Sequence, residues 1–464
     1  MSPVLTVTAS ELMAAGVPST LANEAVAAMK PLALGSGRTY YVATTGRDSN
    51  DGLSLNRPFA TVGKAVSAAR AGDTIYVRGG TYRITSTIGP SRSGTATNRI
   101  TLKNYNNEKV TLEGSGLSDG TKILRWSNVS YWTISGINVT KAGGIGISFM
   151  DNAHHNRLEN LESHHNRGPG VAVERGAYQN QIVRVKSYFN YDSQDKGENA
   201  DGFAPKFDSR DNVFVYCEAY NNSDDGWDSW DAGRFLAMYC IAHHNGLDAN
   251  GRAISPDGDG NGFKLGGGNN SGNNFLIYCV SYLNLSRGFD WNDATARNTL
   301  INCTAYDNQG VNYRLQNATI KNSISYGSSN SISSSTQQNN SWTLNISDPR
   351  FASTNPAAPN FLYLSANSPA LNRGTRTGLK FTGTAPDLGA FEYGAEWRGG
   401  VTSPDPTPNP TPNPPPTPTP APVRPATLIV GPAEVTVSYP NGRIVLLSDA
   451  AETELMNFLK KYSL

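Results

Sequence analysis

The amino-acid sequence predicts an all-β protein whose main body is a parallel β-solenoid, in which short strands wind into stacked coils. The middle of the chain repeats one pattern: an alternating strand with a small residue or Cys, then an aromatic residue or His, then Asn. The pattern recurs about every 23 residues, except where an insertion at 247–262 lengthens one interval. Short strands at such a period, separated by Asn- and Gly-containing turns, indicate three strands and three turns per coil. The repeats lie at 158–168, 182–191, 214–222, 236–246, 276–284, 300–310 and 320–329.

The N-terminal part predicts three helices. Residues 1–37 hold two of them, the second starting near Ser19. Apolar residues between Val62 and Ala69 keep helical spacing, and Gly72 stands where a C-cap would. We expect this third helix to cap the first coil of the solenoid.

Four segments are expected along the chain. After about residue 345 the repeat fades into an edge segment that should cover the last coil. A Pro-, Thr- and Asn-rich stretch then predicts an extended spacer. The final segment predicts strands with a turn at Asn441–Gly442 and a helix beginning near Ser448; alone it is small for a stable core, so we expect it to oligomerise or to dock on a particle. The segments are a leader or adaptor at 1–37, the solenoid at 38–398, a linker at 399–425 and a small α/β module at 426–464.

The composition limits the classes of partner. The 464 residues carry a formal net charge of +1 and no basic stripe, so we expect no nucleic-acid partner. No run of about eighteen apolar residues exists, so we expect no membrane insertion. The N-terminus lacks the basic start and apolar core of a signal peptide. We still expect an extracellular place of action, reached after removal of a leader, by another export route, or on a particle.

The four cysteines follow the solenoid period. Cys217, Cys240, Cys279 and Cys303 each stand at the shared small-residue position of a repeat. No CxxC pair occurs, which argues against a zinc ribbon. We expect free thiols that stack in the core on successive coils.

A second repeat places polar residues on one face. Five segments align on a Gly that is followed by a large apolar residue, which should point inward. Because a strand alternates its faces, the residue two after the Gly should point outward, and we expect the residue before the Gly on that same face. The glycines are Gly202, Gly226, Gly262, Gly288 and Gly310, and the inward residues are Phe203, Trp227, Phe263, Phe289 and Val311. The outward residues are Asp201, Asp225, Asn261, Arg287 and Gln309 before the Gly, and Ala204, Asp228, Lys264, Asp290 and Asn312 after it.

This alignment brings acidic residues of different coils together, since adjacent coils are about 4.8 Å apart. Asp201 and Asp225 become neighbours, Asp228 stands beside Lys264, and Asp224 lies where its strand begins. Clustered carboxylates resist ionisation unless a cation joins them, and Ca²⁺ prefers such oxygen-rich sites. A bound cation would also lower the pKa of Lys264 toward that of a usable base.

A metal beside a lysine base is the chemistry of β-elimination on a uronic-acid polymer. The metal grips the substrate carboxylate and acidifies the carbon next to it, the base takes that proton, and the glycosidic oxygen leaves. A glycosidase would need two carboxylates flanking the bond, for which Asp224 and Asp225 could be proposed. The crowded carboxylates and the lysine fit metal binding better. Two simpler interpretations stay open: acidic turns that are only solvated, and a structural ion pair between Lys264 and Asp228.

Residues on neighbouring coils are candidates for substrate binding. Arg287 and Arg314 could bind substrate carboxylates, and Trp230 could stack on a sugar ring. Asp290 belongs to the same outward face. Each of them could equally be an ordinary surface residue. The stretch "DGDGNG" at 257–262 has calcium-loop spacing without the acidic twelfth position, so we favour a Gly-rich turn over a second Ca²⁺ site.

The motifs "NADGFAPK", "SDDGWDSWD" and "GNGFKLGG", in that order, resemble the calcium-dependent pectate lyases of polysaccharide lyase family nine. The resemblance covers roughly residues 38–395. It implies a right-handed parallel β-helix that cleaves polygalacturonate by anti-elimination. By motif, it implies that Asp201, Asp224, Asp225 and Asp228 are the Ca²⁺ ligands and that Lys264 is the Brønsted base.

Other functions stay open beside a pectate lyase. A phage tail spike or fibre could carry the same chemistry as a receptor-binding depolymerase of a host surface polysaccharide. A non-catalytic carbohydrate-binding β-helix could keep the metal site for structure alone. A β-helical glycoside hydrolase is a further alternative.

Overall fold

A computed structural model describes residues 6–395 and three strands of the C-terminal segment, at 427–430, 434–439 and 442–447. The chain divides into two compact units, Met1–Pro406 and Thr407–Leu464, and each is described by itself. The predicted linker at 399–425 and the helix predicted near Ser448 lie outside the described residues.

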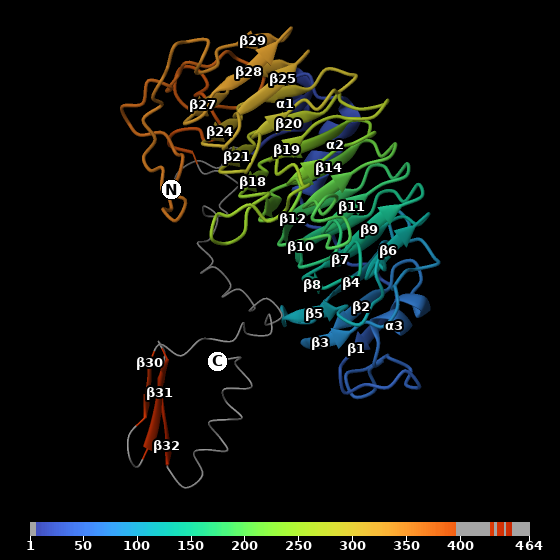
Figure 1. Ribbon diagram of the computed structural model, residues 1–464. Helices are drawn as coiled ribbons and strands as arrows, with labels where there is room; N and C mark the ends of the chain where they lie inside the picture. The colour runs from blue at the N-terminus through green and yellow to red at the C-terminus, as the bar shows by residue number, and fades with distance from the viewer. Residues whose placement is uncertain (1–5, 396–426, 431–433, 440–441, 448–464) are drawn as a thin grey trace. The chain divides into compact units, whose positions relative to one another are not determined.

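The first unit is a parallel β-helix, as the sequence predicted (Figure 1). Equivalent strands of successive coils pair in parallel and form three tracks along the axis. The first track holds β1 (Thr39–Val42), β2 (Thr74–Val77), β4 (Ile100–Asn104), β7 (Trp132–Ser135), β10 (Arg157–His164), β12 (Gln181–Tyr188), β14 (Asn212–Val215), β17 (Phe235–Met238), β20 (Phe275–Ile277), β23 (Thr299–Ile301), β26 (Thr319–Lys321) and β29 (Thr336–Gln338). The second holds β3 (Gly80–Arg83), β5 (Val110–Glu113), β8 (Ile137–Thr140), β15 (Glu218–Tyr220), β18 (Ile241–His243), β21 (Val280–Tyr282), β24 (Thr304–Tyr306) and β27 (Ile324–Tyr326), and β10 and β12 extend into it. The third holds β6 (Leu124–Ser127), β9 (Ile147–Met150), β11 (Val171–Val173), β13 (Phe203–Pro205), β16 (Trp227–Asp228), β19 (Phe263–Lys264), β22 (Phe289–Asp290), β25 (Tyr313–Gln316) and β28 (Asn330–Ser333).

An aromatic stack fills the core beneath the third track. Phe203, Trp227, Phe263 and Phe289 are fully buried, with ring centroids 4.5, 4.6 and 5.1 Å apart along the stack. The next ring is Tyr313, at 5.0 Å from Phe289. The sequence alignment was wrong at this last coil, where it placed Val311 inward. Asn312 takes the place of the aligned Gly there, because Phe289 N donates to Asn312 O.

The aligned glycines are required by close packing between coils. A Cβ on Gly226 would lie 2.5 Å from the carbonyl oxygen of Gly262 and 2.8 Å from Asn245 Nδ2. Such contacts are shorter than any side chain tolerates. The Gly therefore lets the third track approach the asparagine ladder inside the helix.

That ladder consists of buried Asn side chains, each of which donates from Nδ2 to the Oδ1 of the next coil at 2.8–2.9 Å. The sequence separation between neighbouring Asn residues of the ladder gives the number of residues in each coil. The step from Asn190 to Asn222 is 32 residues, and the step from Asn245 to Asn284 is 39. The second step contains the predicted insertion at 247–262. The first reveals another insertion, at 191–199, that the sequence analysis missed.

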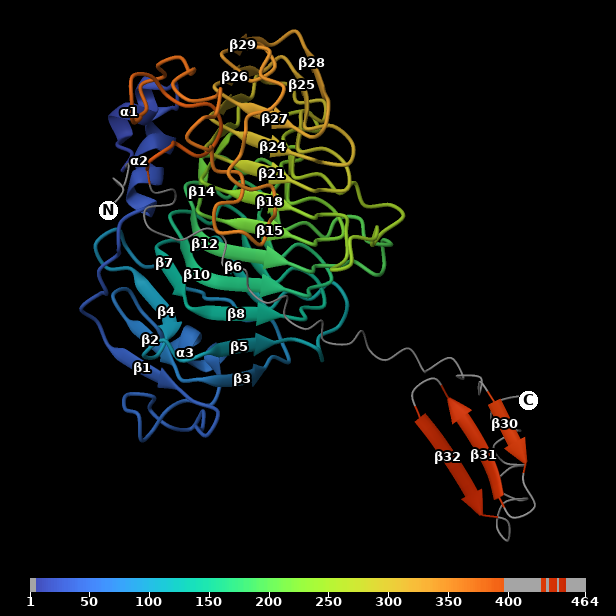
Figure 2. The same cartoon turned by 90° about the vertical axis from the view of Figure 1, so that its left-hand side faces the viewer.

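The helices lie where apolar strand faces would otherwise meet water (Figure 2). α1 (Ala9–Ala14) and α2 (Ser19–Ala28) bury Leu12 and Leu21 against the outer face of the first track, in one cluster with Val213 and Leu236. α3 (Val62–Ala68) packs against the first coils. Its C-cap is Ala69, so the expected C-cap at Gly72 was wrong; Gly72 instead occupies the turn before β2, with φ +89°.

All four cysteines are free and buried, as predicted. They immediately precede β15, β18, β21 and β24, so they stack on successive coils. The segment after residue 345 packs against the later coils, where Phe361 meets the ring of Tyr282 edge-on at 4.8 Å. None of the helices among the described residues is long and apolar enough to cross a bilayer.

The described part of the second unit is an antiparallel sheet of β30 (Thr427–Val430), β31 (Glu434–Tyr439) and β32 (Gly442–Leu447). Tyr439 pairs with Gly442, which places Gly442 in the strand rather than in the expected turn position. The role of this module in oligomerisation or docking stays a prediction.

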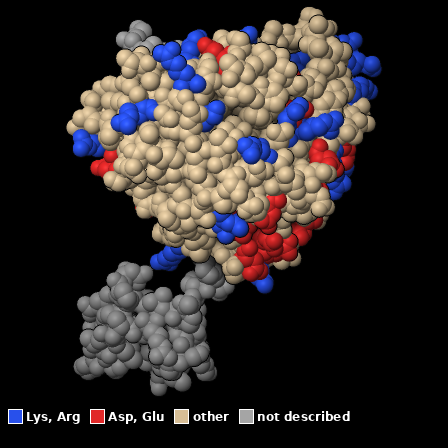
Figure 3. All heavy atoms as spheres, turned by 90° about the horizontal axis from the view of Figure 1, so that it is seen from above, with Lys and Arg blue, Asp and Glu red and all other residues tan. Residues whose placement is uncertain are grey.

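Charged residues are spread over the first unit. On the face in Figure 3, Lys and Arg are scattered in small groups, and Asp and Glu gather near one edge. No continuous basic stripe crosses this face.

Candidate active site

Three neighbouring strands of the third track carry the predicted site residues. Asp228 on β16 lies opposite Lys264 on β19, and Lys264 lies opposite Asp290 on β22. Asp201 and Asp225 lie one coil apart at the start of β13 and β16, since Gly202 N donates to Asp225 O at 2.9 Å. The parallel register therefore assembles residues that are up to about ninety positions apart in the chain.

The four aspartates form a buried cluster. Their exposed fractions are 0–3% for Asp201, Asp224, Asp225 and Asp228. Single oxygens of Asp201, Asp225 and Asp228 lie within 4.8 Å of one another, and so do those of Asp224, Asp225 and Asp259. Oxygens that bind one Ca²⁺ at 2.3–2.6 Å lie at such separations. All the atoms of this donor set are carboxylate oxygens, so the set fits a hard cation.

Hydrogen bonds from both insertions orient the acidic residues. The carboxylate of Asp224 accepts from Asn199 N at 2.9 Å and from Asp259 N at 2.8 Å. Asp225 Oδ1 accepts from Asn261 N at 2.8 Å. The insertions of both long coils thus donate hydrogen bonds to Asp224, which explains why they occur in the coils next to the acidic cluster.

Lys264 reaches into the cluster. Its Nζ lies 3.2 Å from Asp225 Oδ2, 3.7 Å from Asp228 Oδ2 and 2.8 Å from Asp259 Oδ2. Burial lowers the pKa of Lys264, but the attraction of these carboxylates outweighs burial and raises the pKa well above its usual range. The sequence analysis expected a lowered pKa from a bound cation; the protein's own groups act in the opposite direction.

The lysines do not fully offset the burial and mutual repulsion of the aspartates. Burial raises the pKa of Asp201, Asp224 and Asp225, and repulsion between neighbouring carboxylates adds to this effect. Lys264 lowers the pKa of Asp224 and Asp225 without cancelling the rise. Such a cluster is stabilised by any further cation that enters it.

Sequence reasoning missed Lys206, the second lysine of the cluster. It follows β13 directly, and its Nζ lies 2.9 Å from Asp201 Oδ2 and 2.7 Å from Asp228 Oδ2. Only its place in the motif "NADGFAPK" could have drawn attention to it.

Asp290 is fully buried between two arginines. Its carboxylate lies 3.2 Å from Arg287 Nη1 and 3.1 Å from Arg314 Nη1. The Arg314 guanidinium lies over the ring of Trp291, 6.0 Å from its centroid. The prediction that Asp290 binds substrate does not fit this burial: Asp290 holds Arg287 and Arg314, whose side chains remain about one third exposed.

Trp230 is 41% exposed and lies just past β16. Its ring meets Phe207, itself 40% exposed, at 5.6 Å. Exposed aromatic rings beside a polar cluster suit the apolar face of a sugar. Sequence reasoning identified Trp230 and missed Phe207, which follows Lys206.

The stretch at 257–262 does not converge on one cation. Asp257 pairs with Lys196 at 3.1 Å, Asp259 pairs with Lys264, and Asn261 is buried. Among the described residues Asp257 belongs to no acidic group able to share a metal. This arrangement agrees with the favoured Gly-rich turn.

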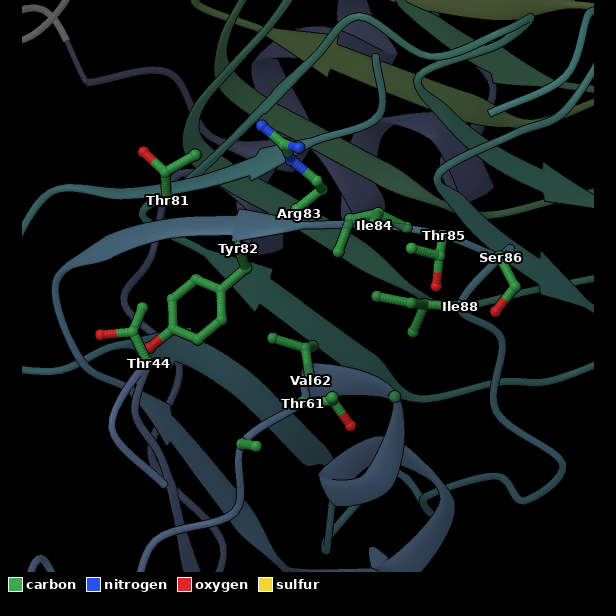
Figure 4. A pocket seen from close by; sticks show the side chains of 12 residues that line it. Thr44, Thr61, Val62, Thr81, Tyr82, Arg83, Ile84, Thr85, Ser86 and Ile88 are labelled. Atoms are coloured by element: carbon green, nitrogen blue, oxygen red, sulfur yellow. The ribbon is translucent and has the colours of Figure 1, made fainter. Parts of the chain in front are cut away.

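A separate pocket lies beside the first coils. It encloses about 310 Å³ between α3 and the end of β3. Figure 4 shows Tyr82, Ile84, Ile88 and Val62 directed toward it. It contains none of the predicted site residues, so it is distinct from the acidic cluster.

Comparisons with known proteins agree with this geometry. The family described as the "Pel9A-like, right handed beta helix region" matches residues 40–339. Pectate lyase L of Dickeya dadantii (strain 3937) is 32% identical over 395 residues, which cover 76% of this chain and 90% of the relative. Pectate lyase PEL9 of Emericella nidulans is 32% identical over 288 residues, covering 54% and 69%.

Solved structures support the same assignment. The crystal structure of pectate lyase Pel9A has a TM-score of 0.72 and 32% identity, covering 77% of this chain and 97% of that one. A rhamnogalacturonan lyase at 23% identity has a TM-score of 0.64 and shares the fold. The chain therefore belongs to the Pel9A-like right-handed β-helix family, and it is a polysaccharide lyase of the pectate lyase type.

Proposed function

We propose that this protein is a Ca²⁺-dependent lyase that cleaves a pectate- or polygalacturonate-like polymer by β-elimination, with Lys264 as the base. The observation that carries the proposal is the contact of Lys264 Nζ with Asp225 and Asp228 at 3.2 and 3.7 Å, inside a buried cluster in which carboxylates outnumber lysines. Asp201, Asp224, Asp225 and Asp228 would hold the metal. The proposed place of action is extracellular, because a long polysaccharide does not cross membranes.

Bound Ca²⁺ would supply positive charge that binds the substrate carboxylate and acidifies the C–H bond beside it. Lys264 must be neutral to act, and its position beside the proposed metal ligands would place Nζ near this proton. The nitrogen lone pair takes the proton, and the C–H electrons form a carbon–carbon double bond. The glycosidic C–O bond breaks, and its electron pair leaves with the oxygen, which takes a proton from solvent. The products are an unsaturated uronate end and a new hydroxyl end.

The neighbouring coils would bind the rest of the polymer. Arg287 and Arg314 are held by Asp290 with their guanidinium groups partly exposed, so they suit the carboxylates of adjoining sugar units. Trp230 would stack on a sugar ring. Asp290 contributes by fixing both arginines.

One assay tests the proposal. Polygalacturonate with Ca²⁺ should yield unsaturated products that absorb in the near ultraviolet, and EDTA should abolish the signal. Lys264→Ala should abolish it while the circular dichroism spectrum and the melting temperature show a folded protein. A fully active Lys264→Ala would refute the base. Reducing ends without the chromophore would indicate a hydrolase, and binding without cleavage would indicate a carbohydrate-binding β-helix.

A further inference from the structure

Lys206 is a buried cation in the wall of the acidic cluster. The residue is 8% exposed, and its ammonium pairs with Asp201 and Asp228 at 2.9 and 2.7 Å. The backbone N of Lys206 donates to Val173 O at 3.0 Å, and this hydrogen bond ties Lys206 to the preceding coil. Because the Lys206 ammonium is buried and pairs with two carboxylates, it is not available to contact substrate.

The two lysines approach Asp228 from different coils. Lys206 follows β13, on the coil before Asp228, whereas Lys264 lies in β19, on the coil after it. Both contact the same oxygen, Asp228 Oδ2, at 2.7 and 3.7 Å. Lys264 also contacts Asp259, whose side chain is 49% exposed, so Lys264 lies nearer the surface of the cluster than Lys206.

The two lysines do not balance the acidic charges of the cluster. Four buried carboxylates and the half-exposed Asp259, which pairs with Lys264 at 2.8 Å, face two ammonium groups, so negative charges outnumber positive ones. A divalent cation would reduce this excess. Without Lys206, the excess would be larger by one charge, and Asp201 would have no cationic partner among the described residues.

We propose that Lys206 is the built-in counter-cation of the metal site: it holds Asp201 and Asp228 together when no metal is bound and limits the affinity of the site for a divalent cation. This inference rests on the proposed Ca²⁺ site. Lys206 pairs with Asp201 and Asp228, two of the residues that would hold the cation, and its charge would repel that cation, so Lys206 is a positioning residue and the base remains Lys264.

The test compares Lys206→Met with wild type by calorimetric titration with Ca²⁺ alone and by melting in EDTA and in Ca²⁺. Lys206→Met should bind Ca²⁺ about tenfold or more tightly, since a repelling charge is removed. Its melting temperature should fall strongly in EDTA and recover in Ca²⁺. The matched control is Lys186→Met, which removes another lysine paired with a buried carboxylate, Glu218, outside the cluster. The control should lower the melting temperature equally in both conditions and leave Ca²⁺ affinity unchanged.

Each outcome decides the proposal. Equal losses of melting temperature in EDTA and Ca²⁺, with unchanged affinity, would make Lys206 an ordinary structural residue and overturn it. If Lys206→Met does not fold, Lys206→Gln replaces it in the test. A variant that folds only with Ca²⁺ supports the proposal. If both variants stay unfolded in saturating Ca²⁺, the proposal is contradicted. If wild type itself binds no Ca²⁺, the proposed function fails instead, independently of either variant.

Discussion

Asp228 and Lys264 lie opposite each other in the parallel pair of β16 and β19, with Lys264 Nζ 3.7 Å from Asp228 Oδ2. The same oxygen lies 2.7 Å from Lys206. Asp228 therefore joins the proposed base, the internal counter-cation and the proposed metal in one group of charges, and removing its charge should disturb all three.

Asp228→Asn should lower the affinity for Ca²⁺ at least about tenfold and reduce lyase activity more strongly, because one proposed ligand and one partner of Lys264 are lost together. Titration calorimetry and the near-ultraviolet assay measure the two effects. Asp231→Asn is the matched control, since Asp231 Oδ1 accepts backbone N–H groups of Asn269 and Asn270. Wild-type Ca²⁺ affinity in Asp228→Asn would contradict the proposed ligand.

Asp259 should position Lys264. Lys264 Nζ lies 2.8 Å from Asp259 Oδ2. Asp259 belongs to the insertion at 247–262, and its backbone N donates a hydrogen bond to the Asp224 carboxylate. Asp259→Ala should reduce kcat about tenfold to a hundredfold through a misplaced amine, with little change of KM. Stability should change little, because the side chain of Asp259 is half exposed. Recovery of most of the activity in Asp259→Glu would support this role; an effect on KM alone would argue against it.

The aspartate–lysine pairing could be predicted because the shared Gly fixes the register between coils, so residues at the same offset from it become neighbours. This register places Asp201 beside Asp225 and Asp228 beside Lys264, as in the structure. Lys206 escaped it, because it lies past the end of β13, at an offset from the Gly that the alignment did not compare. Its contacts depend on how the chain bends after the strand.

Other errors have equally local causes. Val311 was aligned on Gly310, but the last site coil uses Asn312 in the position of the Gly, so the inward residue is Tyr313. Alternation correctly put Asp290 on the outward face, yet outward did not mean exposed, because Arg287 and Arg314 cover it. One covering side chain, Arg287, comes from the same coil and the other, Arg314, from the next coil, and alternation alone does not show that they fold over Asp290.

Arg314→Gln should raise KM for polygalacturonate about tenfold, because a charged hydrogen bond to a substrate carboxylate is lost. A heavily methyl-esterified polymer lacks that charge, so its KM should change less. The comparison of the two polymers separates lost recognition from general damage. Arg297→Gln is the control, since Arg297 is bonded to Asn317 and Thr336 outside the cluster. Equal effects of Arg314→Gln on both polymers would exclude carboxylate recognition.

Glu392 makes stability depend on pH. The side chain is buried and accepts from Thr382 N at 3.0 Å and Asp387 N at 3.2 Å. Burial, aided by the nearby Asp387, raises the pKa of Glu392 from 4.5 to about 7. A raised carboxyl pKa means that the folded state holds the proton more tightly, so the stability contribution is full below pH 4.5 and is lost as the pH rises to about 7.

Replacing Glu392 by Gln should remove this loss, because the amide stays neutral at every pH. With Ca²⁺ present in all samples, Glu392→Gln and wild type should have similar stability at pH 4.5. At pH 8 the variant should be more stable by up to about 3 kcal/mol, the free energy that corresponds to a shift from 4.5 to about 7. Melting temperatures at both pH values measure the difference, and a variant that is less stable than wild type at pH 8 would show that ionised Glu392 is a favourable partner in the fold.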